Sequence, residues 1–115
     1  MINQFAVTVR KEGDFAVLYT DGYVNNLGGE KIGEAAMALI GEGVKKLIIN
    51  MEKSTVINSI GISILIEVIE KIQEIEGYLV FCGLTKTIAK TFTIMGLAQF
   101  AQIADDEASA VALLG

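Results

Sequence analysis

Residues 44–82 read VKKLIINMEKSTVINSIGISILIEVIEKIQEIEGYLVFC and contain two apolar segments separated by an amphipathic one. The short apolar runs at 47–49 and 78–82 are typical of central strands that are covered on both faces. Between them, residues 59–76 repeat apolar side chains at helical spacing, and the pattern ends at Gly77. The stretch therefore predicts a strand, a helix and a second strand parallel to the first, which is the repeating unit of an α/β fold.

The segments on either side of this unit extend the same pattern. Upstream, the alternation of Phe5, Val7 and Val9 predicts a strand with one buried face. Residues 11–14 then form a turn, and residues 15–19 a second strand that pairs with the first in a hairpin. A helix is expected over residues 29–40, ending at two nearby glycines.

Downstream, the sequence predicts a helix over 85–95, a short strand over 102–104 and a last helix over 105–114. The resulting order is a hairpin followed by alternating helices and strands. We therefore expect a single domain over residues 1–115, an α/β fold with a four- to five-stranded mixed sheet and about four helices packed against it.

The composition excludes several classes of function. Nine Lys and Arg stand against fourteen Asp and Glu, which gives a formal charge of -5, and Arg10 is the only arginine. Binding to nucleic-acid phosphates needs a basic surface, so we expect no direct nucleic-acid partner. The chain has no histidine, which removes histidine-based catalysis and histidine metal ligands. The single cysteine, Cys82, allows no internal disulfide and fits a reducing compartment.

No segment of the sequence resembles a targeting signal or a membrane span. Residues 1–5 lack the basic and apolar regions of a signal peptide. The longest uncharged stretch, 91–104, is interrupted by Thr, Gly and Gln and is shorter than the ~20 mostly apolar residues that a spanning helix needs. We expect a cytoplasmic protein without a membrane partner.

Motifs for cofactor binding and catalysis are absent or lie in the wrong context. The Gly-Glu-Gly element at 41–43 ends a predicted helix, whereas a dinucleotide site requires such glycines where a helix begins. The adjacent acids at 105–107 stand at a predicted helix start, where capping is the expected role. Cys82 ends an apolar strand and is expected to be a buried structural thiol. Because no nucleophile and base can be paired, we expect no enzyme and no cofactor.

One segment has the features of a modifiable site: residues 56–63, VINSIGIS. It lies where a strand end turns into the predicted helix, with Asn58 or Ser59 as the natural N-cap. Free backbone N–H groups and the positive end of the helix dipole favour a phosphate at this place. A phosphate on Ser59 would add about two negative charges to the surface. These residues also leave open that Ser59 is a plain helix cap.

Steps of 100° per residue divide this helix into a solvent face and a core face. The expected solvent face carries Ser63, Glu67, Glu70, Lys71 and Glu74, and the expected core face carries Ile62, Leu65, Ile69 and Ile72. Extending the solvent face to the start of the helix places Ile60 and Ile64 on it, beside Ser59. Two exposed isoleucines beside a modifiable serine predict a docking patch, unless a loop covers them.

This segment and its setting resemble the STAS domain, the fold of bacterial anti-sigma factor antagonists. In that family an Asp-Ser-Ser/Thr-Gly motif opens the second helix, and an anti-sigma factor that is a serine kinase phosphorylates its first serine. Residues 58–61, Asn-Ser-Ile-Gly, stand in the place of that motif. Residues 22–25 look like the family's Gly-Glu-Leu-Asp turn, residues 49–50 like the Leu-Asp end of its central strand, and residues 91–100 like its Thr-Gly-Leu stretch. The likeness extends over nearly the whole chain.

The resemblance implies both a function and a site. The function is that of an anti-sigma factor antagonist, which binds the anti-sigma factor and frees a sigma factor for transcription until phosphorylation of Ser59 breaks the complex. The resemblance gives no oligomeric state. Together with the helix geometry, it gives as partner-binding or switch residues Asn25, Asn58, Ile60, Gly61, Ser63 and Ile64.

The chain departs from the family pattern at several positions. Asn25, Asn50 and Asn58 stand where the family commonly has Asp, and Ile60 replaces the second hydroxyl residue. Asn keeps the hydrogen-bonding shape without the charge, which at position 58 removes a like charge beside a phosphate on Ser59. Two alternatives stay open: a STAS scaffold or regulatory module that is not phosphorylated, and a small nucleotide-binding regulatory domain that uses the surface of the three asparagines.

Overall fold

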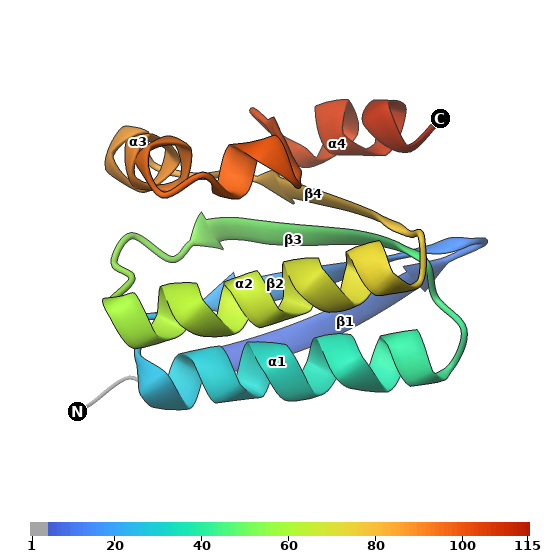
Figure 1. Cartoon of the computed structure of the whole chain (residues 1–115), viewed down its shortest axis with the longest axis horizontal. Coiled ribbons are helices and arrows are strands. Elements are labelled where there is room, and N and C mark those ends of the chain that lie inside the picture. Colours follow the sequence, from blue (N-terminus) through green and yellow to red (C-terminus); the bar gives the residue numbers. More distant parts are fainter. Residues whose placement is uncertain (1–4) are drawn as a thin grey trace.

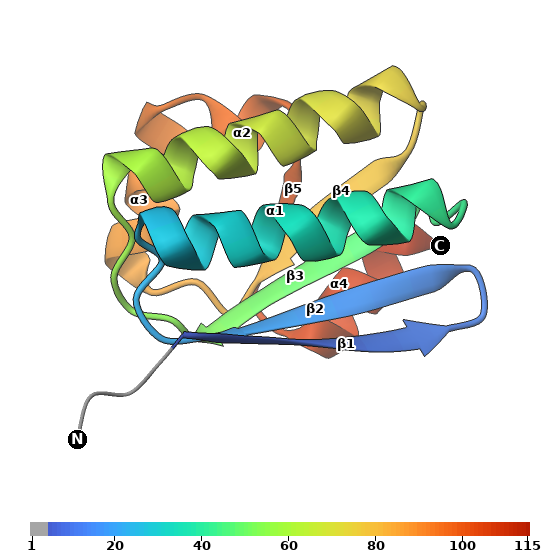
Figure 2. The same cartoon turned by 90° about the horizontal axis from the view of Figure 1, so that it is seen from below.

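The computed structural model describes residues 5–115 and contains a five-stranded sheet in the strand order β1-β2-β3-β4-β5 (Figures 1 and 2). Residues 1–4, on which the expectation of no signal peptide depends, lie outside the described residues. The elements are β1 (Ala6–Glu12), β2 (Phe15–Asp21), α1 (Asn26–Gly41), β3 (Lys46–Lys53), α2 (Ser59–Glu74), β4 (Tyr78–Cys82), α3 (Lys86–Ile94), the 3-10 turn η1 (Leu97–Gln99), β5 (Gln102–Ala104) and α4 (Glu107–Leu114).

The pairing of the strands confirms the expected mixed sheet. β1 and β2 form an antiparallel hairpin, whereas β2, β3, β4 and β5 pair in parallel. A two-residue turn closes the hairpin, and its Gly13 has a φ of 56°, which glycine adopts without the steric cost that other residues have there. Helices connect the successive parallel strands, as the alternating pattern of the sequence predicts.

Helices cover the two faces of the sheet unequally. α1 and α2 lie side by side on one face and α4 lies on the other (Figures 1 and 2). The larger apolar cluster joins α1, α2 and α3 to the sheet, and a smaller one joins α4 to Val17, Ile48 and Val80. Because successive residues of a strand point to opposite faces, neighbouring side chains of β3 belong to different clusters. No helix of residues 5–115 has the length and apolar character needed to cross a membrane.

The structure confirms the role predicted for Cys82 and for one of the acids that precede α4. Cys82 is fully buried in the smaller cluster, and this burial raises the pKa of its thiol to about 12. Asp106 is the N-cap of α4: its carboxylate accepts a 2.8 Å hydrogen bond from the backbone N–H of Ser109, which lowers the pKa of Asp106. Glu107, the first residue of α4, bonds to Arg10 and Asn50.

β1 differs from the strand expected from its alternating pattern. The expected buried face would include Val9, but Val9 is 45% exposed. Val9 is exposed because β1 is the edge strand of the sheet and an open groove lies between the side of β1 that carries Val9 and the helix α1. The alternation therefore identified the strand correctly but overestimated its burial.

Candidate functional site

The first turns of α1 and α2 lie next to each other at one end of the sheet (Figures 1 and 2). An asparagine caps each helix. Asn58 accepts a 2.8 Å hydrogen bond from the N–H of Gly61, and Asn25 accepts one of 3.0 Å from the N–H of Gly28. The segments before the helices are also joined, since the N–H of Asn58 donates to the carbonyl oxygen of Val24 over 3.1 Å. The two caps thus form one connected surface.

Glycine permits this close approach. A Cβ atom at Gly61 would lie 2.4 Å from the carbonyl oxygen of Val24 and 3.2 Å from a side-chain carbon of Ile57. On α1, a Cβ atom at Gly29 would lie 3.2 Å from the Cα atom of Gly61. Any larger residue at position 61 would push the start of α2 away from the segment that carries Val24. Gly61 therefore supports the site through packing.

Ser59 is the first residue of α2 and is exposed. Within the described part of the chain, the backbone N–H groups of Ser59 and Ile60 have no hydrogen-bond acceptor, and neither α1 nor α2 has an acidic residue in its first turn. The positive ends of two helix dipoles are therefore not neutralised at this place, which favours an anionic group. Ser63 is one turn further along and also exposed, and its hydroxyl donates a 2.7 Å hydrogen bond to the carbonyl oxygen of Ile60.

Four exposed apolar side chains surround this pair of helix starts. We call them the switch-end patch: Tyr23, Leu27, Val56 and Ile60, which are between 48% and 66% exposed. The exposure of Ile60 agrees with the helix geometry of the sequence. The other three were not predicted, although each lies within two residues of one of the two capping asparagines. Apolar side chains gathered at one end of a small protein indicate a contact surface.

Ile64 does not lie on the open solvent face of α2, and that expectation was wrong. Its side chain is half-buried and packs on α1, where a Cβ atom at Gly29 would lie 2.8 Å from the Ile64 Cδ1 atom and one at Gly33 would lie 3.1 Å from its Cγ2 atom. The glycines of α1 leave space that the isoleucine fills. Ile64 therefore links the two helices, and only Ile60 of the two isoleucines projects freely beside Ser59.

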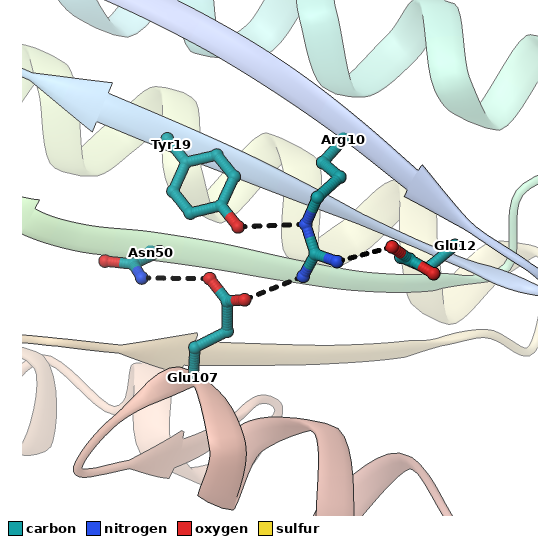
Figure 3. Close-up of polar contacts among 5 residues, drawn as sticks. All are labelled: Arg10, Glu12, Tyr19, Asn50 and Glu107. Atoms are coloured by element: carbon teal, nitrogen blue, oxygen red, sulfur yellow. Dashed lines mark hydrogen bonds and ion pairs between the residues drawn. The ribbon is translucent and has the colours of Figure 1, made fainter.

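Asn50 lies apart from the other two asparagines. It points to the opposite face of the sheet, where its Nδ2 atom donates a 3.3 Å hydrogen bond to Glu107 and its Oδ1 atom accepts one from the N–H of Glu52 (Figure 3). The expected common surface of Asn25, Asn50 and Asn58 is therefore not formed. Strand geometry is the cause: Ile49 points towards α1 and α2, so Asn50 must point towards α4.

The contacts of Glu107 connect α4 to the hairpin. Its carboxylate accepts a 2.7 Å bond from Arg10, whose Nε atom also donates to the hydroxyl of Tyr19 and whose other terminal nitrogen reaches Glu12 (Figure 3). Burial raises the pKa of Tyr19, and its hydrogen bond with Arg10 contributes to the raised pKa of that guanidinium. These groups are bonded to one another, and residues 5–115 contain no cluster of three or more acidic or cysteine side chains able to hold a metal ion.

Comparison with known proteins identifies the family. The model of the STAS domain matches residues 6–110 of the chain. The chain belongs to the STAS domain family.

Relatives of this STAS domain are anti-sigma factor antagonists. A Bordetella bronchiseptica protein, BtrV, which is named as an anti-sigma factor antagonist, is 22% identical over 106 residues that cover 92% of this chain and 91% of BtrV. The crystal structure of an anti-sigma factor antagonist from Mycobacterium paratuberculosis has a TM-score of 0.86 at 15% identity, covering 96% of this chain and 94% of that one. The phosphorylated form of the Bacillus cell fate determinant SpoIIAA has a TM-score of 0.76 at 19% identity, covering 96% of this chain and 100% of its own. At these identities the structural likeness establishes the fold.

Proposed function

We propose that this STAS domain is an anti-sigma factor antagonist that binds a kinase-type anti-sigma factor through its switch-end patch and loses that affinity when Ser59 is phosphorylated. The observation that carries the proposal is the position of Ser59: an exposed hydroxyl at the start of α2, next to Ile60 of the switch-end patch. Binding would free a sigma factor from the anti-sigma factor and thereby regulate transcription.

The switch follows from the different effects of a phosphate in the free protein and in a complex. In the free protein, the N–H groups and dipole at the start of α2 stabilise the phosphate, and no acidic side chain in either first turn repels it. In the complex, the apolar side chains of the patch exclude water, so about two negative charges without a partner oppose association. Phosphorylation thus leaves the fold intact and weakens the complex.

In this proposal the chain is a substrate and not an enzyme. The partner kinase transfers the γ-phosphoryl group of ATP to the Ser59 Oγ atom, which loses its proton as the new oxygen–phosphorus bond forms and ADP leaves. Asn58 fixes the start of α2 through its bond to the Gly61 N–H and thereby holds the hydroxyl in a defined position. The existence of a phosphorylated form of SpoIIAA, a structural relative, supports the same chemistry here. The protein would act in the cytoplasm, where its kinase and sigma factor are found.

Phosphorylation by the partner kinase and ATP tests the proposal. We expect wild-type protein to gain one phosphate by intact-mass analysis and Ser59→Ala to gain none. Ser63→Ala is the matched control, because Ser63 is an exposed serine one turn away on the same helix, and this variant should still gain one phosphate. A phosphate that persists on Ser59→Ala contradicts the assignment. A wild-type protein that binds the kinase but is never phosphorylated is the alternative STAS module that works by assembly alone.

A further inference from the structure

Within residues 5–115, no strand pairs with the outer edge of β1. β1 has seven residues and forms one edge of the sheet, whereas β5 at the other edge has only three. A groove of about 520 Å³ runs between β1 and α1, and its lining includes Val7, Val9 and Ala35 together with Lys31 and Glu34. An edge strand of this length with an exposed apolar side is a surface on which another strand can pair.

The hairpin register determines which backbone groups of β1 face outward. Glu12 and Phe15 flank the two-residue turn and form a hydrogen-bonded pair, as residues next to such a turn do. In an antiparallel ladder every second pair is bonded, so Arg10, Thr8 and Ala6 also direct their N–H and C=O groups towards β2. The intervening residues, Val7, Val9 and Lys11, therefore direct these groups to the free edge.

We propose that two copies of this chain associate through antiparallel pairing of their β1 strands about a two-fold axis at Val9. Val9 is the midpoint of Ala6–Glu12, so this register pairs the whole strand and continues the sheet from one copy into the other. It brings Val9 opposite Val9, and the other facing pairs, each occurring twice, are Val7 with Lys11, Thr8 with Arg10 and Ala6 with Glu12. All three outward residues then form hydrogen bonds across the axis.

The charges of the edge agree with this register. No two like charges face each other in this register, whereas a register centred on Arg10 would place two arginines directly opposite each other, which is destabilising. Lys11 of one copy comes opposite Val7 of the other, which lines the groove together with Glu34. Lys11 forms an ion pair with Glu42 of its own chain, so its charge is balanced within each copy and adds no repulsion between the two.

The mass of the protein in solution tests the proposal. Sedimentation at increasing concentration should show the wild-type mass rising from 12.3 kDa towards twice that value. Val9→Lys, which places two ammonium groups opposite each other, should stay monomeric at every concentration with an unchanged circular dichroism spectrum. Ile94→Lys is the control, since Ile94 is an even more exposed apolar residue on α3, and it should associate as the wild type does. A monomeric wild type, or a Val9→Lys variant that still dimerises, overturns the proposal.

Crosslinking tests the register separately. Hydrogen-bonded facing residues have Cα atoms about 5.5 Å apart, within the range that a disulfide spans, so Val9→Cys should form a disulfide-linked dimer under mild oxidation. Lys11→Cys is the control: two residues at position 11 would be four positions apart along the paired strands, roughly 13 Å, and should not crosslink. The natural Cys82 does not interfere because it is buried. Crosslinking through position 11 in preference to position 9 overturns the register.

Discussion

Replacement of Gly61 with alanine is expected to loosen the site, because the added Cβ atom would collide with the backbone of Val24. The new Cβ atom would lie 2.4 Å from the carbonyl oxygen of Val24, whereas ordinary contact begins at 3.4 Å, so the two segments must separate by about 1 Å. That separation breaks the 3.1 Å bond from the N–H of Asn58 to the same oxygen. The variant tests whether the start of α2 is packed as tightly as the structure shows.

The magnitude follows from three contributions. Overpacking costs about 1–3 kcal/mol, and the lost hydrogen bond costs about 1 kcal/mol. The higher helix propensity of alanine compared with glycine offsets about 1 kcal/mol of this cost. We therefore expect Gly61→Ala to lower the free energy of unfolding by about 1–3 kcal/mol, which for a domain of this size lowers the melting temperature by roughly 4–12 °C.

Gly41 is the matched control, because it is also helical and a Cβ atom there meets nothing within 4 Å. Gly41→Ala should leave stability unchanged or raise it by up to about 1 kcal/mol. Urea and thermal unfolding followed by circular dichroism measure both variants. If Gly61→Ala is as stable as Gly41→Ala, the close contact between α2 and Val24 does not exist in solution and the reasoning is refuted.

Three further predictions concern the core, the cap and the buried thiol. Leu65→Ala should cost ~2–5 kcal/mol in urea unfolding because Leu65 is fully buried, whereas Ile60→Ala should cost ~0.5 kcal/mol or less and yet reduce binding of the anti-sigma factor. Asn58→Asp keeps the cap and should raise the rate of Ser59 phosphorylation, measured by intact mass, with little change in affinity; an unchanged rate would show that this carboxylate has no bearing on phosphoryl transfer. The folded pKa of Cys82, about 12, exceeds its ordinary 9.0, so the stability that the neutral buried thiol contributes is complete below pH 9 and is lost as pH rises towards 12. Urea unfolding across this pH range should show a smaller loss of the free energy of unfolding for Cys82→Ala than for the wild type. Equal losses would contradict the raised pKa of Cys82.

Local patterns were sufficient to predict the elements and the caps. The apolar runs around Ile48 and Val80 and the helical spacing between them gave the central strands and α2, because a covered strand and an amphipathic helix each bury a periodic set of side chains. Asn58 was predictable as a cap because an Asx side chain bonds the backbone N–H three residues later within the same segment. These features depend on neighbours in sequence.

Contacts between distant segments were not predictable in the same way. The position of Ile64 depends on Gly29 and Gly33, which lie on another helix and leave a space that no periodicity of α2 reveals. The burial of Val9 depends on its strand being at the edge of the sheet. The switch-end patch likewise results from the approach of two loops joined by hydrogen bonds between Val24 and the segment 56–58.

The separation of Asn50 from the capping asparagines has a simpler origin. Residue parity along β3 decides which face each side chain occupies, and the apolar run around Ile48 does not reveal which parity faces the helix pair. The structure places Asn50 with the α4 side, where Glu107 binds it. The three asparagines that replace the family's aspartates therefore lie in two different places: Asn25 and Asn58 at the helix starts, and Asn50 on the opposite face of the sheet.

The affinity of the anti-sigma factor for the phosphorylated and unphosphorylated protein tests the central claim most directly. Calorimetric titration of the purified partner should give a dissociation constant at least tenfold lower, equivalent to about 1.4 kcal/mol, for the unphosphorylated protein than for the protein phosphorylated on Ser59. Ser59→Ala should bind as tightly as the unphosphorylated wild type after treatment with kinase and ATP. Equal affinities for the two forms of the wild-type protein would contradict the account, because Ser59 would then carry no switch.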